Sequence, residues 1–408
     1  MKFLDPLNLV FWAAITVMPA TPGYAGTTAA DAPYKIVDTA QLMGAGRIDY
    51  VYADSVNRHL YVPRGNAVLV FNLDTLKPES PIPNLMGGHG VAADADSGHA
   101  FSSSQPVIIW DSKKLETIKT ITVQGRPDGI LAEPLTKRIY VFSHEAPNAT
   151  VLDAKDGSIV GTIDLGGGPE QAASDGEGHL YVDLEDKDSI AVVDVKTLKV
   201  TATYSLGGKG GGPGGLGLDA KNHILFAFCH QPATCVILSA VDGKILDTLP
   251  IGNGTDGGGF NPATMEAFSS QGDGTLTIIK ENSPTSFAVE QTVQTIRGAK
   301  TCALDARNNH IIVIATDRPA PPPGAPAATP GSTNAAPATA SAPATPPVAP
   351  TPAPGSVAQT AANAPPGAGG PGGPGSPEGR PGGAGGPGGR RGGFGGGPAM
   401  LHILVVGR

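Results

Sequence analysis

Ionisable side chains recur at one position of a sequence repeat. Counting five residues back from the residue that ends the first expected strand of each repeat gives Asp49, His89, Asp128, Glu170, Gly214, Asp256 and Lys300. If the repeats surround a common axis, these residues meet at one mouth of a central channel. Crowded carboxylates repel one another, so one of them would hold a proton or the set would bind a hard cation such as calcium.

The sequence therefore predicts a polar-ligand or cation site at this mouth. The predicted ligand-binding residues are Asp49, His89, Asp128, Glu170, Asp256 and Lys300, and the candidate metal ligands are Asp49, Asp128, Glu170 and Asp256. The alternative is a wet, polar channel in which Lys300 and His89 only neutralise nearby acids. No cofactor is predicted beyond a possible calcium or other divalent cation. His144 and His230, in loops after two second strands, are interpreted as surface histidines.

The repeat unit itself predicts the fold. A unit of about 40 residues recurs seven times between Tyr34 and Arg408, a length typical of one β-propeller blade. Each unit contains four short β-branched stretches separated by Asp/Gly/Lys turns, which predicts a four-stranded antiparallel meander. We therefore expect an all-β, seven-bladed β-propeller.

The seventh unit is interrupted. Residues 319–398 are rich in Pro, Ala and Gly and lack the apolar side chains of a core, so we expect a disordered insertion within the last blade. The seventh unit lacks an outer strand, and Tyr34–Ala40 has the outer-strand pattern of the other units. The N-terminal strand is therefore predicted to close blade seven. The propeller then comprises 34–318 and 399–408. The alternative is a six-bladed ring with frayed ends.

Residues 1–25 resemble a secretory signal peptide, with an apolar run and small residues before the expected cleavage point. The expected location is periplasmic or extracellular, with no membrane span after signal removal; an uncleaved lipid-facing tail is the alternative. A net charge of −8 makes a nucleic-acid partner improbable. The chain is expected to be a monomer.

The three cysteines have two expected roles. Cys229 and Cys235 flank a hairpin loop and are predicted to form a disulfide in an oxidising compartment. Cys302 occupies a position held by apolar residues in other repeats, so a buried core thiol is expected.

Two stretches carry a family resemblance. Tyr181-Val182 followed by Val192-Val193-Asp194, and the Leu-Val-Val-Gly-Arg terminus, resemble YVTN-repeat β-propellers, in particular secreted bacterial YncE-like proteins. The resemblance covers the chain except the signal and the insertion. It implies the propeller fold, but most of that family has no assigned activity, and its relatives include dehydrogenase subunits and lyases. The motif is degenerate here, because Tyr140-Val141-Phe142-Ser143 lacks the Asn.

The function expected from these features is a binding or interaction scaffold that uses the channel face. Its partner would be a protein, a glycan or a small ligand. The alternative is a metal-assisted, lactonase-like hydrolase or a lyase, in which His89 would act as general base. The sequence has no Gly-x-Ser-x-Gly elbow and no paired-cysteine metal motif. A third possibility is a surface module tethered by the 319–398 insertion.

Overall fold

The computed structural model describes residues 32–317 and 398–408. The predicted signal, 1–25, and nearly all of the predicted insertion, 319–398, lie outside the described residues. All described strands belong to one compact unit. In this part of the chain, no helix is long and apolar enough to cross a membrane.

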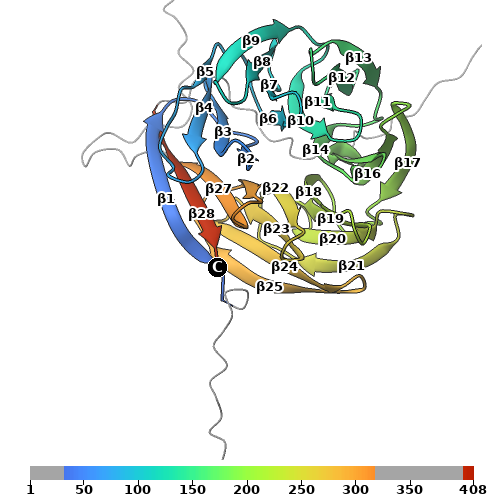
Figure 1. The fold of residues 1–408 in the computed structure, drawn as a ribbon. Helices are drawn as coiled ribbons and strands as arrows, with labels where there is room; N and C mark the ends of the chain where they lie inside the picture. Colours follow the sequence, from blue (N-terminus) through green and yellow to red (C-terminus); the bar gives the residue numbers. More distant parts are fainter. Residues whose placement is uncertain (1–31, 318–397) are drawn as a thin grey trace, which may run out of the picture. The chain divides into compact units, whose positions relative to one another are not determined.

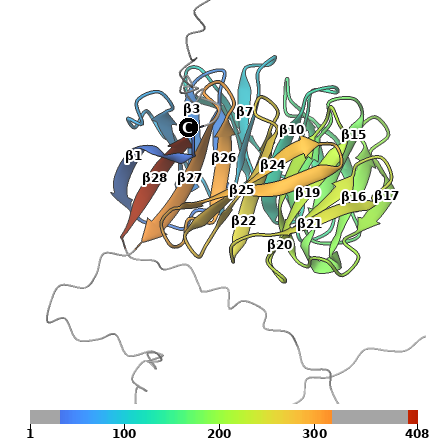
Figure 2. The ribbon, with the colours of Figure 1, turned by 90° about the horizontal axis from the view of Figure 1, so that it is seen from below.

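Seven antiparallel sheets of four strands form the ring, which confirms the predicted seven-bladed β-propeller (Figure 1). Seen edge-on, the strands of each blade run between the two faces of the ring (Figure 2). The first strand of each blade lies nearest the channel.

The strands of blades one to three are, from the channel outward, β2 (Tyr52–Asp54), β3 (His59–Arg64), β4 (Ala67–Asn72) and β5 (Ile82–Pro83); β6 (Val91–Asp94), β7 (His99–Ser102), β8 (Val107–Asp111) and β9 (Glu116–Ile121); β10 (Pro127–Glu133), β11 (Arg138–Ser143), β12 (Ala149–Asp153) and β13 (Ile159–Ile163). Those of blades four and five are β14 (Pro169–Ser174), β15 (His179–Leu184), β16 (Ser189–Asp194) and β17 (Lys199–Ser205); β18 (Pro213–Asp219), β19 (Ile224–Cys229), β20 (Thr234–Ser239) and β21 (Ile245–Pro250). Those of blades six and seven are β22 (Thr255–Asn261), β23 (Glu266–Gln271), β24 (Thr275–Ser283) and β25 (Ser286–Gln294); β26 (Thr301–Asp305), β27 (His310–Asp317), β28 (Ala399–Gly407) and β1 (Lys35–Gly44). A short 3-10 turn, η2 (Glu185–Lys187), follows β15.

The acid that ends most first strands has a structural role. The Asp54 carboxylate accepts hydrogen bonds from the backbone N–H groups of Val56 and Asn57 at 3.0 and 2.9 Å. Glu133 does the same for Leu135 and Thr136 at 2.8 Å each. A short acidic side chain that bonds the backbone two and three residues on stabilises a tight turn. The repeat therefore needs this acid to start each β-hairpin.

The N-terminal strand closes blade seven, as predicted, and the six-bladed alternative is wrong. Strand β1 pairs antiparallel with β28, with Leu42 opposite Leu401 (Figure 1). The closing strands are anchored on blade six: the Tyr34 hydroxyl donates a 2.6 Å hydrogen bond to Glu266, and Arg408 pairs with the same carboxylate. The Arg408 guanidinium also lies 4.3 Å from the centre of the Tyr34 ring. Both ends of the propeller are thus fastened at one carboxylate.

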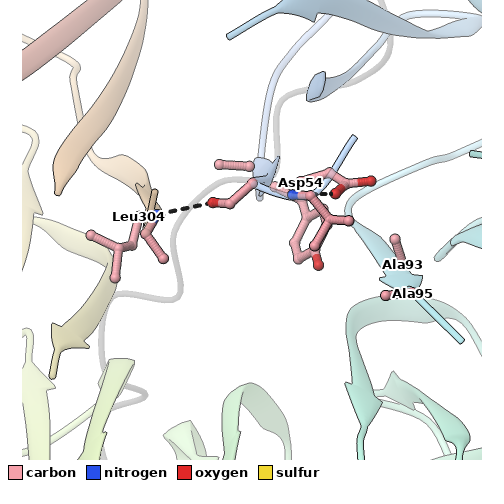
Figure 3. A pocket seen from close by; sticks show the side chains of 9 residues that line it. Asp54, Ala93, Ala95 and Leu304 are labelled. Carbon is pink, nitrogen blue, oxygen red and sulfur yellow. Dashed lines mark hydrogen bonds between the residues drawn. The ribbon is translucent and has the colours of Figure 1, made fainter. Parts of the chain in front are cut away.

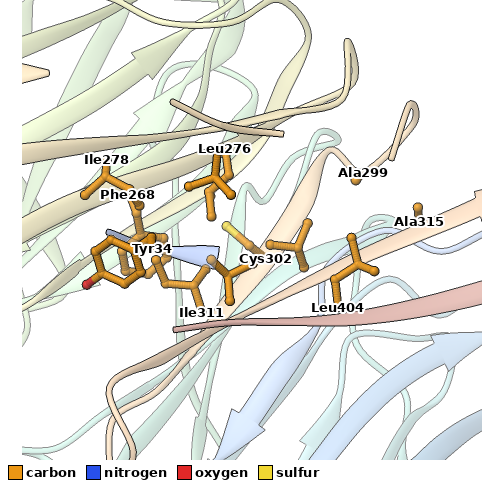
Figure 4. Close-up of a cluster of buried hydrophobic side chains, with 12 residues drawn as sticks. Tyr34, Phe268, Leu276, Ile278, Ala299, Cys302, Ile311, Ala315 and Leu404 are labelled. Carbon is orange, nitrogen blue, oxygen red and sulfur yellow. The ribbon is translucent and has the colours of Figure 1, made fainter. Parts of the chain in front are cut away.

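The core lies between neighbouring blades. Between blades six and seven, Phe268 and Leu276 pack against Cys302, Ile311 and Leu404 (Figure 4). Cys302 is a buried core thiol, as expected, and burial raises its pKa to about 11. Each blade buries its faces only by contact with its neighbours, so the closed ring is the stable unit.

The predicted disulfide between Cys229 and Cys235 is wrong, because both are free, buried thiols. The hairpin register pairs Cys229 with Thr234 and Cys235 with Phe228. Neighbouring residues of a strand point to opposite faces of a sheet. Cys229 accordingly packs in the core between blades four and five, and Cys235 in the core between blades five and six.

We expect a thiol reductant to leave the thermal midpoint of the protein unchanged. Burial raises the pKa of Cys229 and of Cys235, so neither thiol ionises or reacts readily in the folded protein. A thiol reagent should titrate all three cysteines only in denaturant. A lower midpoint in reductant, with one reactive thiol in the unreduced denatured chain, would contradict the structure.

Candidate functional site

Three of the predicted mouth residues form a carboxylate–histidine–carboxylate group. Asp49 precedes β2, His89 precedes β6 and Asp128 lies in β10. The Nδ1 atom of His89 lies 2.7 Å from Asp49 Oδ2 and 3.1 Å from Asp128 Oδ1. The first strands of blades one to three therefore bring these side chains together, as the repeat count predicted.

A second group shares Asp128. His144, just after β11, has its Nε2 atom 3.2 Å from Asp128 Oδ2 and 3.1 Å from Glu170 Oε1. Glu170 lies in β14. All five side chains are partly buried. We call Asp49, His89, Asp128, His144 and Glu170 the carboxylate–histidine cluster.

The expectation that His144 is a surface loop residue is wrong. Strands β10 and β11 pair Pro127 with Ser143, so the end of β11 lies next to the start of β10, and the His144 side chain reaches Asp128 from there. The signal was present in the hairpin pattern, because an antiparallel second strand returns its end to the start of the first. His230 follows the same rule in blade five. Its ring lies against Gly214, where a Cβ atom would meet Nε2 at 2.7 Å.

Tyr50 crosses the mouth and was not predicted. Its hydroxyl donates a 2.5 Å hydrogen bond to Glu170 Oε2, joining blade one to blade four. Burial, together with the charges of Glu170, Asp128 and Asp49, raises the pKa of Tyr50 well above its usual value. The phenol therefore keeps its proton and remains a donor.

The remaining predicted residues form a separate pair. Lys300 and Asp256 are in direct contact across blades six and seven. Among the described residues, the groups whose possible ligand atoms lie within 4.8 Å of one another are Asp49, His89 and Asp128, and Asp128, His144 and Glu170. Asp256 belongs to neither group, so the predicted set of four carboxylates divides into a cluster of three and one ion pair.

The carboxylates favour the charged form of both cluster histidines. Burial lowers the pKa of His89, but the Asp128 and Asp49 carboxylates raise it by more. The net result is a pKa of about 10, above the usual 6.5. The neighbouring Glu170 carboxylate raises the pKa of His144 against the effect of burial. Each cluster histidine lies between two carboxylate oxygens, which also attract a cation. The cluster can therefore take up a cation, or exchange its protons for one.

Contacts across the first strands tie neighbouring blades together next to the cluster. The Gln171 side chain accepts hydrogen bonds from the N–H groups of Leu216 and Gly258, at 3.0 and 3.1 Å, and thereby ties blade four to blades five and six. A Cβ at Gly215 would lie 2.9 Å from the Gly257 carbonyl carbon, so glycine is required there.

The cavity in the channel measures about 320 Å³. A smaller one, about 250 Å³, lies at the opposite end beside Asp54, Ala93, Ala95 and Leu304 (Figure 3). Neither the carboxylate–histidine cluster nor the Lys300–Asp256 pair lines these two cavities.

No family model and no curated protein matches the chain. Solved structures do. A chain of the mitotic checkpoint complex is 12% identical, with a TM-score of 0.60, and the match covers 76% of this chain and 96% of that one. The WD40 repeats of RRP9 are 9% identical (TM-score 0.57, covering 69% and 92%). U3-55K is 10% identical (TM-score 0.53, covering 67% and 90%). At these identities the likeness shows the β-propeller fold alone.

Proposed function

We propose that this protein is a binding scaffold whose channel mouth takes up a positively charged ligand. The observation that carries the proposal is the convergence of three carboxylates from blades one, three and four on two histidines. Such a group is costly to assemble, since like charges in a partly buried site repel one another. A cationic ligand removes that repulsion.

The rest of the mouth supports a binding role. Tyr50 fixes the Glu170 side chain, and Gln171, the next residue of β14, ties that strand to blades five and six. A rigid, preorganised group loses little conformational entropy when a ligand binds. The Lys300–Asp256 pair borders the same mouth and keeps that side neutral.

The location and family are further parts of the proposal. The signal-like residues 1–25 support a periplasmic or extracellular protein. The Tyr-Val and Val-Val-Asp repeats support a place among YncE-like, YVTN-type propellers. Fractionation of cells that produce the full chain tests the first point: recovery of the uncleaved chain in the cytoplasm would overturn it.

An enzyme, a lactonase-like hydrolase or a lyase, is the second candidate. The observation that favours it is the pair of histidines within contact distance of carboxylates. The role of His89 as general base is disfavoured, because an imidazole with a pKa of about 10 does not accept a proton near neutral pH. Turnover of a lactone that is lost in Asp128→Asn would favour this candidate over a scaffold.

We expect Asp128→Asn to abolish cation binding at the mouth. Asp128 contacts both histidines, so its negative charge would attract a cation bound beside either of them. The probes are zinc, manganese and calcium ions, spermidine and an oligolysine peptide, each added to the protein in a thermal-unfolding scan. A ligand present at 100 times its dissociation constant stabilises the folded state by about 2.7 kcal/mol.

Asp156→Asn is the matched control, because Asp156 is an exposed residue of the turn between β12 and β13 and, among the described residues, makes no ion pair or hydrogen bond with the cluster. The control variant should respond to the probes as the wild type does. A wild-type protein that responds to none of the probes, or a response equal in both variants, would refute a cationic ligand at this mouth.

A further inference from the structure

We propose that the carboxylate–histidine cluster binds two divalent transition-metal ions bridged by Asp128. The proposal rests on the proposed function, because it names the cationic ligand of the same mouth. One ion would be held by Asp49, His89 and Asp128, and the other by Asp128, His144 and Glu170.

The separations within each group fit a metal coordination shell. The three nitrogen–oxygen distances to Asp128 and Glu170 are 3.1, 3.2 and 3.1 Å. Metal–ligand bonds of about 2.0–2.1 Å place neighbouring ligand atoms about 3.3 Å apart in a tetrahedral site. These three separations therefore already lie near the edges of such a polyhedron, whereas His89 Nδ1 and Asp49 Oδ2, at 2.7 Å, lie at a hydrogen-bond distance and would have to move apart for an ion to enter.

Two ions fit better than one. The His89 and His144 nitrogens belong to different groups, and no group of the described residues brings both within 4.8 Å together with the carboxylates. Asp128 directs Oδ1 to His89 and Oδ2 to His144. A carboxylate that offers one oxygen to each side is the usual bridge between two ions, which lie about 3.5–4 Å apart in two-metal sites.

The donor atoms favour transition metals over calcium. Calcium takes oxygen ligands, whereas imidazole with carboxylate suits zinc, manganese, iron or cobalt. The Nε2 atom of His144 is shielded from solvent and makes no aligned hydrogen bond, although two carboxylate oxygens lie within 3.2 Å. A ring nitrogen between two carboxylate oxygens can hold either a proton or an ion there, so a metal ion would bind by displacing the imidazolium proton.

Tyr50 orients one ligand. Its hydroxyl holds Glu170 Oε2 and leaves Oε1 facing His144. Hydrogen bonds of this kind fix ligating carboxylates, and their loss commonly weakens metal binding about 10–100-fold. Tyr50 is thus a positioning residue, and Tyr50→Phe should lower affinity at the second ion without changing the number of ions bound.

The test is metal content and cobalt absorption of the chain 26–408, stripped with chelator and dialysed against zinc or cobalt. We expect two ions per chain in the wild type, one in His89→Gln and in His144→Gln, and none in Asp128→Asn. His179→Gln is the matched control, since His179 pairs with a single acid, Asp175, outside the cluster. It should retain two ions, and each variant's circular dichroism should match the wild type.

Three results would overturn the metal proposal: fewer than two ions in the wild type, ion counts unaffected by the histidine variants, or equal competition by calcium. A response to spermidine or oligolysine that depends on Asp128, without bound zinc, would overturn the metal proposal and leave the proposed function standing. No response to any cation would overturn both.

Discussion

Replacing Asp305 with alanine should lower the free energy of unfolding by about 3–5 kcal/mol, the usual cost of leaving a buried charge without its partner. Asp305 ends the first strand of blade seven and is 1% exposed. Its two oxygens accept hydrogen bonds from the Arg58 guanidinium at 2.6 and 2.7 Å. Arg58 lies in blade one and is 7% exposed, so the pair joins the last blade to the first. Without Asp305, the ring is weakened where it closes.

Asp74→Ala provides the matched control, because Asp74 contacts the same guanidinium at 2.8 Å but its side chain is 49% exposed. An exposed partner should contribute less than about 1 kcal/mol. Urea unfolding of both variants measures the difference, and Asp305→Asn, which keeps an oxygen acceptor, should fall between them. Equal losses in the two alanine variants would show that burial at the blade junction does not set the strength of the pair.

The same repeat explains why the fold was predictable from the sequence. The acid at the end of most first strands caps a turn, so it recurs for a local reason and marks each blade. The apolar stretch Tyr34–Ala40 had no other strand to pair with, which pointed to closure on β28. Because a similar strand pattern recurs in each blade, every copy supports the assignment of the others. Counting the strands showed that the last blade lacked one, and the N-terminal strand was left to supply it.

The hairpin register of blade five shows where the sequence was insufficient. The loop between Cys229 and Cys235 does not specify which residues pair, and a shift of one residue moves a side chain to the opposite face. With Cys229 opposite Thr234, the thiols point into different blade interfaces. The short spacing in the chain correctly suggested that the two cysteines lie near each other. It did not show that their side chains lie on opposite faces of the blade-five sheet.

The site was predictable in position but not in its pairing. The repeat count located Asp49, His89 and Asp128 on one mouth, because equivalent positions of a ring share one height. It could not show that Tyr50 reaches across to Glu170, or that Asp256 pairs with Lys300. Those contacts depend on side-chain length and direction across the channel, which no local pattern encodes.

We expect Glu281→Gln to stabilise the protein increasingly as pH rises, by about 2–3 kcal/mol more at about pH 8 than at about pH 5. Glu281 and Asp219 meet between blades five and six and are 3% and 1% exposed. Burial raises the pKa of Glu281 from 4.5 to about 7; the hydrogen bond donated by Asn222 lowers it, and the nearby Asp219 carboxylate raises it. The interface between blades five and six therefore contains two neighbouring acids, Glu281 and Asp219. At the interface of blades seven and one, by contrast, the acid Asp305 pairs with Arg58.

The direction follows from the two protonation states. Because the folded-state pKa lies above the unfolded value, the contribution of Glu281 is fully present below about pH 4.5 and is lost as pH rises through about 7. Glutamine imitates the protonated acid at every pH, so the variant escapes the loss. Asp219→Asn should produce a smaller gain, since it removes the nearby carboxylate that raises the pKa of Glu281 but leaves Glu281 buried.

Unfolding by urea at several pH values, read as the difference between variant and wild type, isolates this pair from every other titrating group. Glu177→Gln, at an exposed turn, is the control and should show a difference that does not vary with pH. If the Glu281→Gln difference is flat from about pH 5 to about pH 8, Glu281 has the same pKa in the folded and unfolded protein, and burial between blades five and six does not raise it.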